Sequence, residues 1–376
     1  MKALQMVDTK TQYQKIKKEV DEAVLGVLES SVFIGGKVLN DFVDNLAKYS
    51  GSKHVIPCAN GTDALQIAFM ALDLQPGDEV ITPSFTYIAT VEAAAVLKLK
   101  PVFVEVDKQT FCIDTAAIEK AITQKTKAIV PVHLYGQAAD MEAIMAIAKK
   151  HNLYVVEDNA QAIGCDYTFS DGSVKKTGSI GHIGTTSFYP SKNLGAYGDG
   201  GAIFTDDDTL AAKLKMIAHH GQSKRYYHDV VGCNSRLDAV QAAILDIKLK
   251  HLDEYIGARR KAADYYDKAF ANNAKITTPY RAANNKHVFH QYTLTLEGVD
   301  RDALHNFLAE NGVPSMIYYP VPCHKQKMFD AFGGSGYTLP LTDWLTERVI
   351  SLPMHTEMEE EQQAFIVSKV LEFVNK

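Results

Sequence analysis

The chain has 376 residues, a length that suits one large α/β unit with an appendage or two to three domains. Hydrophobic residues make up 46% of it and charged residues 22%, and its net charge of -6 argues against a general affinity for nucleic acid or anionic membrane. The N-terminus has no secretory apolar run, no stretch approaches the roughly 20 apolar residues of a membrane span, and the five cysteines form no CxxC pair. We therefore expect a cytoplasmic globular protein with reduced thiols and no metal site.

Helix and strand patterns alternate through the first two thirds of the chain. An N-terminal helix carries Val20, Val24, Val27 and Leu28 on one face, and a second helix begins near Gly61. Short apolar runs predict five strands, at 79–82, 101–106, 128–132, 154–157 and 202–205, and a helix is predicted over 141–150. Strands that alternate with helices predict right-handed crossovers and a mainly parallel sheet with helices on both faces.

The last third of the chain has a different pattern. A long helical pattern runs from 237 to about 270, and a smaller α+β unit begins near Thr277. Its predicted elements are strands at 290–296 and 314–319 and helices at 301–311 and 359–374. We expect residues 1–250 to form an N-terminal arm and a large α/β domain, and residues 251–376 to form a linker helix and a small α+β domain.

Polar clusters lie at predicted helix starts and strand ends, where open α/β sheets bind ligands. In the first, Gly61 and Thr62 open a helix whose N–H groups and positive dipole end suit a phosphate. A plain helix cap by Thr62 or Asp63 explains the same pattern. No GxxxxGK[ST] sequence occurs, which disfavours a P-loop nucleotide triphosphatase.

Two further clusters offer reactive groups. Glu157 and Asp158 end an apolar strand, where a carboxylate could bind metal, act as a base, pair with a protonated heterocycle or cap the turn. Lys192 lies among hydroxyls, aromatics and glycines, and burial there would make its amine nucleophilic. A surface lysine on a flexible loop is the alternative. The nearby glycines do not sit in a strand–turn–helix arrangement, which disfavours a dinucleotide-dependent dehydrogenase.

Together these clusters resemble one family of enzymes over nearly the whole chain. The motifs that carry the resemblance, in order, are 58–65, 83–86, 157–161, 187–192, 198–201, 232–238 and 319–322. They resemble the DegT-type nucleotide-sugar aminotransferases, which are fold-type I enzymes that depend on pyridoxal 5′-phosphate (PLP). The resemblance implies a large domain with a mainly parallel sheet flanked by helices and a smaller C-terminal α+β domain.

The resemblance also implies roles for individual residues. Lys192 would hold PLP as a Schiff base and then move the proton, and Asp158 would pair with the protonated pyridine nitrogen. Relatives that deoxygenate a sugar have histidine in place of the lysine, so Lys192 favours amination. The remaining expected cofactor contacts are Gln161 to the ring hydroxyl, Phe85 and Ala160 on the two ring faces, Gly61, Thr62, Asp63 and Ser187 to the phosphate, and Asn234 to the phosphate of the neighbouring subunit in a homodimer.

Substrate contacts are expected in two segments. Lys224 and Arg225 could bind a nucleotide diphosphate, and the alternative is a solvated loop. Arg236 could bind a carboxylate or a diphosphate, and the alternative is an ion pair with Asp238. The resemblance places sugar recognition at Tyr318, Tyr319 and His324. Several relatives have a histidine where this chain has Tyr318, which leaves the identity of the sugar open.

The predicted reaction moves an amino group from an amino acid, expected to be L-glutamate, to a keto nucleotide-sugar. The resemblance favours C3 of a UDP- or dTDP-linked sugar and a product used in a surface polysaccharide such as lipopolysaccharide. The alternatives are amination at C4, another PLP reaction on the same fold, and a non-enzymatic regulator that binds PLP or a sugar nucleotide.

Overall fold

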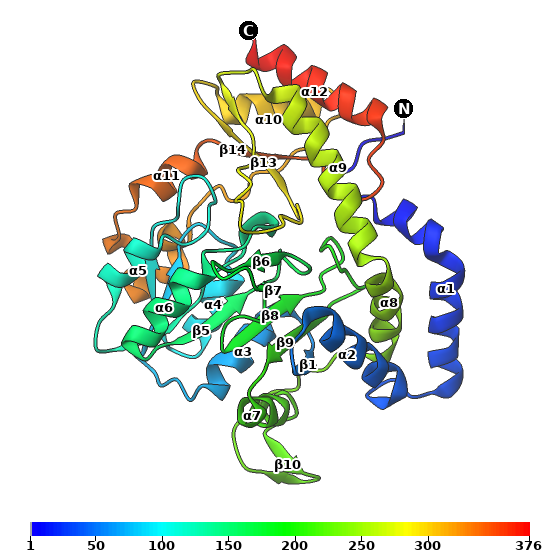
Figure 1. Cartoon of the computed structure of the whole chain (residues 1–376), viewed down its shortest axis with the longest axis vertical. Helices are drawn as coiled ribbons and strands as arrows, with labels where there is room; N and C mark the ends of the chain where they lie inside the picture. Colours follow the sequence, from blue (N-terminus) through cyan, green and yellow to red (C-terminus); the bar gives the residue numbers. More distant parts are fainter. Residues whose placement is uncertain (1) are drawn as a thin grey trace.

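The computed structural model describes residues 2–376, and a seven-stranded sheet forms its centre (Figure 1). Its strands are β1 (His54–Cys58), β2 (Glu79–Pro83), β3 (Lys100–Val104), β4 (Thr126–Ile129), β5 (Tyr154–Asp158), β8 (Ile183–Ser187) and β9 (Gly201–Thr205). The strand order is β1-β9-β8-β5-β4-β2-β3, and every pair from β8 to β3 is parallel, whereas β9 runs antiparallel to β8 and β1. The mainly parallel α/β sheet predicted from the sequence is confirmed.

All five predicted strands are present, and the sequence patterns missed β1 and β8. Strand β1 contains Pro57, which removes a hydrogen-bond donor and is tolerated because β1 lies at the sheet edge. Strand β8 reads Ile-Gly-Thr-Thr-Ser and has only one large apolar residue, at Ile183. Pro57 is atypical of a strand interior, and β8 lacks an apolar run, so the pattern of neither segment indicated a strand.

Helices cover both faces of the sheet (Figure 1). The large-domain helices are α2 (Gly36–Ser50), α3 (Gly61–Ala71), α4 (Ala89–Val96), α5 (Thr115–Ala121), α6 (Met141–His151), α7 (Asp208–Ala218) and α8 (Ala239–Lys250). Successive strand residues enter different cores: Val155 packs in the cluster that contains α2, α6 and α8 residues, and Val156 in the cluster that contains α3 and α7 residues. This alternation explains why the strands are apolar throughout.

The N-terminal helix α1 (Thr9–Ser30) packs against α8 through Val20 and Val27. Leu28, predicted on the same face, is instead 50% exposed. The long helical pattern from 237 to 270 is also wrong as a single helix, because it divides at His251 into α8 and α9 (Leu252–Phe270).

The C-terminal part contains the antiparallel sheet β12-β13-β14, packed against helices (Figure 1). Its elements are β12 (Ile276–Thr277), β13 (Tyr292–Leu296), α10 (Arg301–Glu310), α11 (Pro340–Thr346), β14 (Val349–Leu352) and α12 (Glu360–Val374). The strand predicted at 314–319 is wrong, since only Met316 makes an isolated bridge, to Ser351. The domain boundary after residue 250 stays a prediction.

Two small hairpins complete the chain, formed by β6 (Asp166–Thr168) with β7 (Val174–Lys176) and by β10 (Gln222–Lys224) with β11 (Tyr227–His228). The second hairpin projects from the body of the molecule below α7 (Figure 1). Within residues 2–376, no helix combines the length and the apolar character needed to cross a membrane.

Candidate active site

A cavity of about 770 Å³ opens at the carboxyl ends of β5 and β8. Many of the predicted site residues line it: Gly61, Thr62, Asp63, Asp158, Ala160, Gln161, Ser187, Lys192, Tyr318 and Tyr319. Segments from the sheet, the start of α3 and the C-terminal part therefore meet at one place. This is the position at which open α/β sheets bind ligands.

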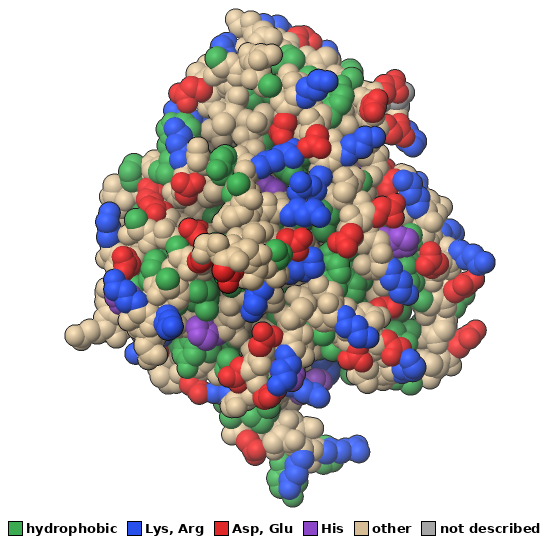
Figure 2. Space-filling model, in the orientation of Figure 1, with side chains coloured by type: hydrophobic (Ala, Val, Ile, Leu, Met, Phe, Trp, Pro, Cys, Tyr) green, Lys and Arg blue, Asp and Glu red, His purple; other side chains and the backbone are tan. Residues whose placement is uncertain are grey.

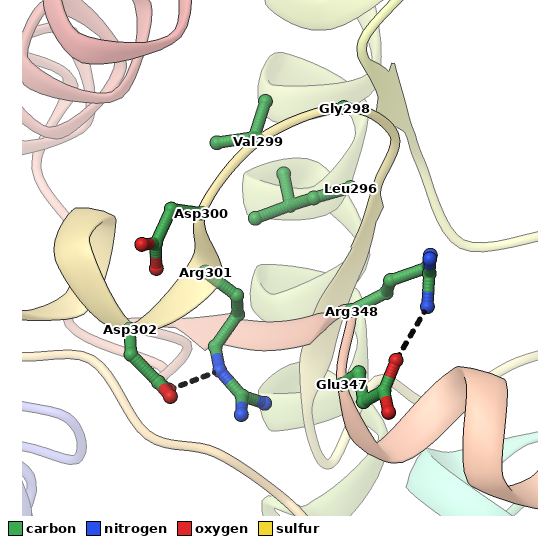
Figure 3. Close-up of a pocket in the computed structure, with 8 residues that line it drawn as sticks. All are labelled: Leu296, Gly298, Val299, Asp300, Arg301, Asp302, Glu347 and Arg348. Carbon is green, nitrogen blue, oxygen red and sulfur yellow. Dashed lines mark hydrogen bonds and ion pairs between the residues drawn. The ribbon is translucent and has the colours of Figure 1, made fainter.

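A second hollow, of about 330 Å³, lies in the C-terminal part (Figure 3). Four of its charged side chains form ion pairs, Arg301 with Asp302 at 2.6 Å and Arg348 with Glu347 at 3.0 Å, and the fifth, Asp300, accepts from the Ala303 N–H. The guanidinium of Arg301 also donates to two backbone carbonyls. These contacts leave little capacity for a ligand, so the larger cavity is the candidate active site.

Lys192 lies on the loop between β8 and β9, and hydrogen bonds hold this loop in place. The Lys192 N–H donates to the carbonyl of Tyr189 at 2.8 Å, and the Asn193 side chain donates to the carbonyl of Val288 at 3.0 Å. From α8, the Lys248 ammonium donates to the carbonyl of Gly195 at 2.5 Å. These contacts favour a well-defined loop conformation over the alternative of a flexible surface loop.

The amine of Lys192 has an altered basicity. Burial lowers its pKa from 10.5 to about 8, and the nearby Asp158 carboxylate opposes part of this shift. His290 also lines the cavity. Burial, together with the charges of Lys192 and Arg259, lowers the pKa of His290 well below its ordinary value, so His290 is neutral. A lysine that is easily neutralised is suited to act as a nucleophile and a proton carrier.

The two carboxylates at the end of β5 have different surroundings. Glu157 is fully buried and accepts hydrogen bonds from His133 and from the backbone N–H groups of residues 178, 180 and 181. Burial alone would raise the pKa of Glu157, but these bonds lower it. Asp158 points to the cavity, where it accepts from Thr90 at 2.7 Å and from the Ala160 N–H at 3.1 Å. The hydrogen bonds of Glu157 are thus to the protein itself, whereas Asp158 faces the cavity.

The start of α3 and the end of β8 lie close together. The helix cap is Asn60, whose side chain accepts from the N–H of Asp63, and neither Thr62 nor Asp63 takes that role. A Cβ at Gly61 would lie only 2.7 Å from the Cβ of Ser187, so this approach requires glycine. The N–H groups of the first helical turn, with the hydroxyls of Thr62 and Ser187, suit a phosphate.

Asp63 does not suit the phosphate contact expected of it. Its N–H is already bonded to Asn60, and its carboxylate would repel a phosphate. Gln161, in contrast, is held in a defined orientation. Its carbonyl oxygen accepts from the Tyr135 N–H at 2.7 Å, and its amide donates to the Tyr319 hydroxyl at 3.0 Å.

Tyr87 lines the cavity together with Tyr189, Tyr318 and Tyr319, and Phe85 does not line it. Phe85 is fully buried and packs against Phe111 and Tyr135. Tyr87 is 57% exposed and lies 6.1 Å from the ring of Tyr319, measured between ring centroids. The chain bends at residues 84–86, which breaks the strand alternation from which side-chain direction could be predicted.

His324 also lies outside the cavity. It is 1% exposed, and its Nδ1 is 2.7 Å from the Ser84 hydroxyl, behind the segment that carries Tyr87. Its ring packs near Phe103 in a short 3-10 turn. The expected sugar contact is therefore not supported, because the side chain faces the core.

The remaining predicted residues lie away from this cavity in the single chain. Lys224 and Arg225 are exposed on the β10–β11 hairpin, where Lys and Arg side chains gather at the tip (Figure 2). Asn234 is exposed near the base of the hairpin, and Arg236 lines a separate hollow of about 270 Å³. Within the described residues Arg236 makes no ion pair with Asp238.

Sequence reasoning missed several residues that line the cavity, namely Thr86, Tyr87, Tyr189, Ser191, Asp199, His290 and Gln291. Tyr189, Ser191 and Asp199 belong to motifs that were already singled out, so their proximity to Lys192 along the chain was an available signal. His290 and Gln291 come from the C-terminal part and carry no such local signal.

The arrangement as a whole fits PLP. The start of α3 with Ser187 offers a phosphate site, Asp158 offers a carboxylate for the ring nitrogen, and Lys192 offers an amine with a lowered pKa. All three face one cavity that is large enough for a cofactor and a substrate group.

Comparison with known proteins identifies the family. The family model described as the DegT/DnrJ/EryC1/StrS aminotransferase family matches residues 14–371. The chain is 48% identical over 370 residues to the "Pleiotropic regulatory protein" of Geobacillus stearothermophilus, covering 98% of both chains. It is 45% identical over 356 residues to the "UDP-2-acetamido-2-deoxy-3-oxo-D-glucuronate aminotransferase" of Pseudomonas aeruginosa, covering 95% of this chain and 96% of the relative.

A solved structure supports the same assignment. The crystal structure of S. venezuelae DesV in complex with a ketimine intermediate superposes with a TM-score of 0.94 at 37% identity, and the match covers 100% of both chains. The chain therefore belongs to the DegT/DnrJ/EryC1/StrS aminotransferase family and is a PLP-dependent aminotransferase.

Proposed function

We propose that this enzyme transfers an amino group from L-glutamate to C3 of a keto sugar linked to UDP or dTDP, for the synthesis of a surface glycan. The observation that carries the proposal is the single cavity shared by Lys192, Asp158 and the phosphate cradle at Gly61. The Pseudomonas relative acts, by its name, on a 3-oxo sugar linked to UDP, which supports C3. The relatives give less support to amination at C4.

Lys192 would hold the cofactor through its amine and would also be the group that moves the proton during transamination. When bound, PLP supplies an electron sink that stabilises negative charge at the reacting carbon. Asp158 would pair with the protonated ring nitrogen through its carboxylate. Gln161 orients the ring hydroxyl, since its own amide is fixed by Tyr135 and Tyr319.

The pKa of Lys192 predicts how cofactor loading depends on pH. Only the neutral amine attacks an aldehyde, and with a pKa of about 8 the neutral fraction rises with pH and reaches half near pH 8. We expect the rate of PLP binding to the apo-enzyme to rise with pH and to level off above about pH 8, as followed by absorbance. A rate that still rises about tenfold per pH unit near pH 9.5 would indicate the ordinary pKa of 10.5 instead.

The ring of PLP requires surfaces on both faces. We assign one face to Tyr87, which replaces Phe85 in this role, and the other to Ala160, whose small side chain leaves room. The phosphate is assigned to Gly61, Thr62 and Ser187. The Ser187 hydroxyl oxygen accepts from the Tyr189 N–H at 3.2 Å, so its own proton remains available to the phosphate.

The proposed enzyme is a cytoplasmic homodimer in which each subunit completes the site of its partner. Among the described residues that line the cavity, Lys192 is the only lysine or arginine, yet a nucleotide diphosphate and glutamate are both anionic. Lys224, Arg225 and Arg236 lie outside their own chain's cavity and are assigned to that of the partner.

Exposed apolar side chains in α1, in the loop after it and in and after the β10–β11 hairpin support this dimer. The residues Leu25, Leu28, Val32, Phe33, Ile34, Tyr226, Tyr227 and Val231 are all large, hydrophobic and exposed in the single chain. Large apolar side chains that are exposed in a single chain can be covered when subunits associate. All five cysteines are free, which fits the reducing cytoplasm.

Subunit complementation tests the shared site. Lys192→Ala removes the amine, and Asn234→Glu would place a negative charge against the cofactor phosphate of the partner, so each variant alone should be inactive. When the two chains are mixed under exchange conditions, half of the dimers contain both, and one of their two sites is intact. We expect recovery of about one quarter of the normal activity. Verified mixed dimers without recovery, or a fully active Asn234→Glu homodimer, would contradict the shared site.

The regulator alternative needs its own test, because the Geobacillus relative is named as a regulatory protein. If the chain is an aminotransferase, adding L-glutamate to the PLP-bound protein should convert the cofactor and shift its absorbance, with release of 2-oxoglutarate. A stable spectrum with glutamate, in a protein that still binds PLP, would favour a regulator.

A further inference from the structure

The carboxylate of Asp158 receives two hydrogen bonds from the protein, one on each oxygen. Its Oδ2 accepts from the Thr90 hydroxyl at 2.7 Å, and its Oδ1 accepts from the Ala160 N–H at 3.1 Å. Asp158 is 6% exposed, and a buried carboxylate is stable as an anion only when such donors replace water. Ala160 belongs to the turn after β5, whereas Thr90 lies in the first turn of α4.

A second threonine helps to determine which group donates the proton in the hydrogen bond between Thr90 and Asp158. The Thr86 and Thr90 hydroxyl oxygens are 3.1 Å apart, and both side chains are buried. A hydroxyl has one proton to donate, and an ionised carboxylate can only accept. Thr90 therefore gives its proton to Asp158, and Thr86 must donate to Thr90. With an ionised Asp158, the protons along this chain of hydrogen bonds therefore point from Thr86 through Thr90 to the carboxylate.

The other groups around Asp158 do not replace this donor. Lys192 and Tyr319 are close enough to interact with Asp158 electrostatically, but both line the cavity. Glu157 is engaged with His133 and the backbone of residues 178–181. Thr90 is therefore the side chain that fixes Oδ2 from within the protein.

We propose that Thr90 is a positioning residue that holds the Asp158 carboxylate oriented toward the ring nitrogen of PLP, with Thr86 as its own supporting donor. This inference rests on the proposed role of Asp158. Without the Thr90 hydroxyl, Oδ2 loses its buried donor, so the carboxylate is free to turn away from the ring nitrogen. The ring nitrogen then loses its proton more readily, and the cofactor becomes a weaker electron sink.

The test compares Thr90→Val, which keeps the shape and removes the hydroxyl, with Thr90→Ser, which keeps the hydroxyl. The full-length holoenzyme is loaded with PLP labelled with ¹⁵N in the ring, and the ¹⁵N chemical shift reports whether the nitrogen is protonated. We expect the Thr90→Val signal to move toward the unprotonated position and kcat for glutamate to fall about tenfold to hundredfold, similar to the loss of hydrogen bonds that orient metal ligands. Thr90→Ser should restore the signal and most of kcat.

An unchanged ¹⁵N signal in Thr90→Val, with kcat within about twofold of normal, would overturn the inference. If Thr90→Val does not fold, Thr86→Val decides the matter. It removes only the supporting donor and should give a smaller shift in the same direction, and no shift would overturn the inference. Asp158→Asn is measured in parallel: a ring nitrogen that stays protonated in that variant would reject the proposed role of Asp158 itself, whatever the Thr90 variants show.

Discussion

Lys192→Ala should lose covalent capture of PLP and lower transamination by at least about 10⁴-fold, because the variant lacks both the amine that binds the cofactor and the group that moves the proton. Borohydride treatment followed by peptide mapping measures the capture, and glutamate turnover measures the rate. The matched control is Lys175→Ala, which removes an exposed lysine on β7 and should behave like the unaltered enzyme.

Two results would contradict the role of Lys192. One is PLP fixed by borohydride in Lys192→Ala at the normal stoichiometry, which would place the covalent bond on another lysine. The buried Lys248, whose pKa burial lowers to about 8, is the alternative that peptide mapping would reveal. The other is turnover within about tenfold of normal, which would show that another group moves the proton.

Asp158→Asn should lower the glutamate half-reaction by about 10³-fold, the effect expected when a charge that stabilises the transition state is removed from a buried site. Asparagine has nearly the same shape but cannot hold the positive charge of a protonated ring nitrogen. Stopped-flow absorbance of the cofactor measures the rate. Asp171→Asn, an exposed aspartate in the β6–β7 turn, serves as the control and should leave the rate unchanged. Near-normal rates in Asp158→Asn would reject its pairing with the ring.

The parts of the site that could be predicted from the sequence are those encoded locally. Lys192, Asp158 and Gly61 each lie within a short motif next to a strand end or a helix start, and the parallel sheet brings those ends together. The five apolar strands were recognisable for the same reason, because burial on both faces leaves a continuous apolar run.

Side-chain direction in irregular segments could not be predicted. Phe85 and Tyr87 are two residues apart, and only the bends at residues 84–86 decide which ring reaches the cavity. His324 follows Tyr319 closely in the chain, but the 3-10 turn at Cys323–Lys325 directs it to Ser84. Neither choice follows from composition or periodicity.

Contacts between residues that lie far apart in the chain could not be predicted from a sequence pattern either. Glu157 and Asp158 are adjacent and chemically alike, and only the placement of His133 and residues 178–181 shows that Glu157 belongs to the fold. The Thr90 contact joins residues 68 positions apart. Asn234 and Arg236 lie outside the cavity of their own chain, so their proposed function depends on a second subunit.

The substrate class is tested most directly by mixing the PLP-bound enzyme with a panel of amino sugars linked to UDP, dTDP or GDP. The absorbance of the cofactor reports the reaction. We predict conversion of PLP to pyridoxamine phosphate by a 3-amino sugar linked to UDP or dTDP, at a rate that exceeds the rates with 4-amino sugars. No conversion by any nucleotide-linked amino sugar, in a preparation that does react with glutamate, would contradict the claim that this aminotransferase acts on nucleotide sugars.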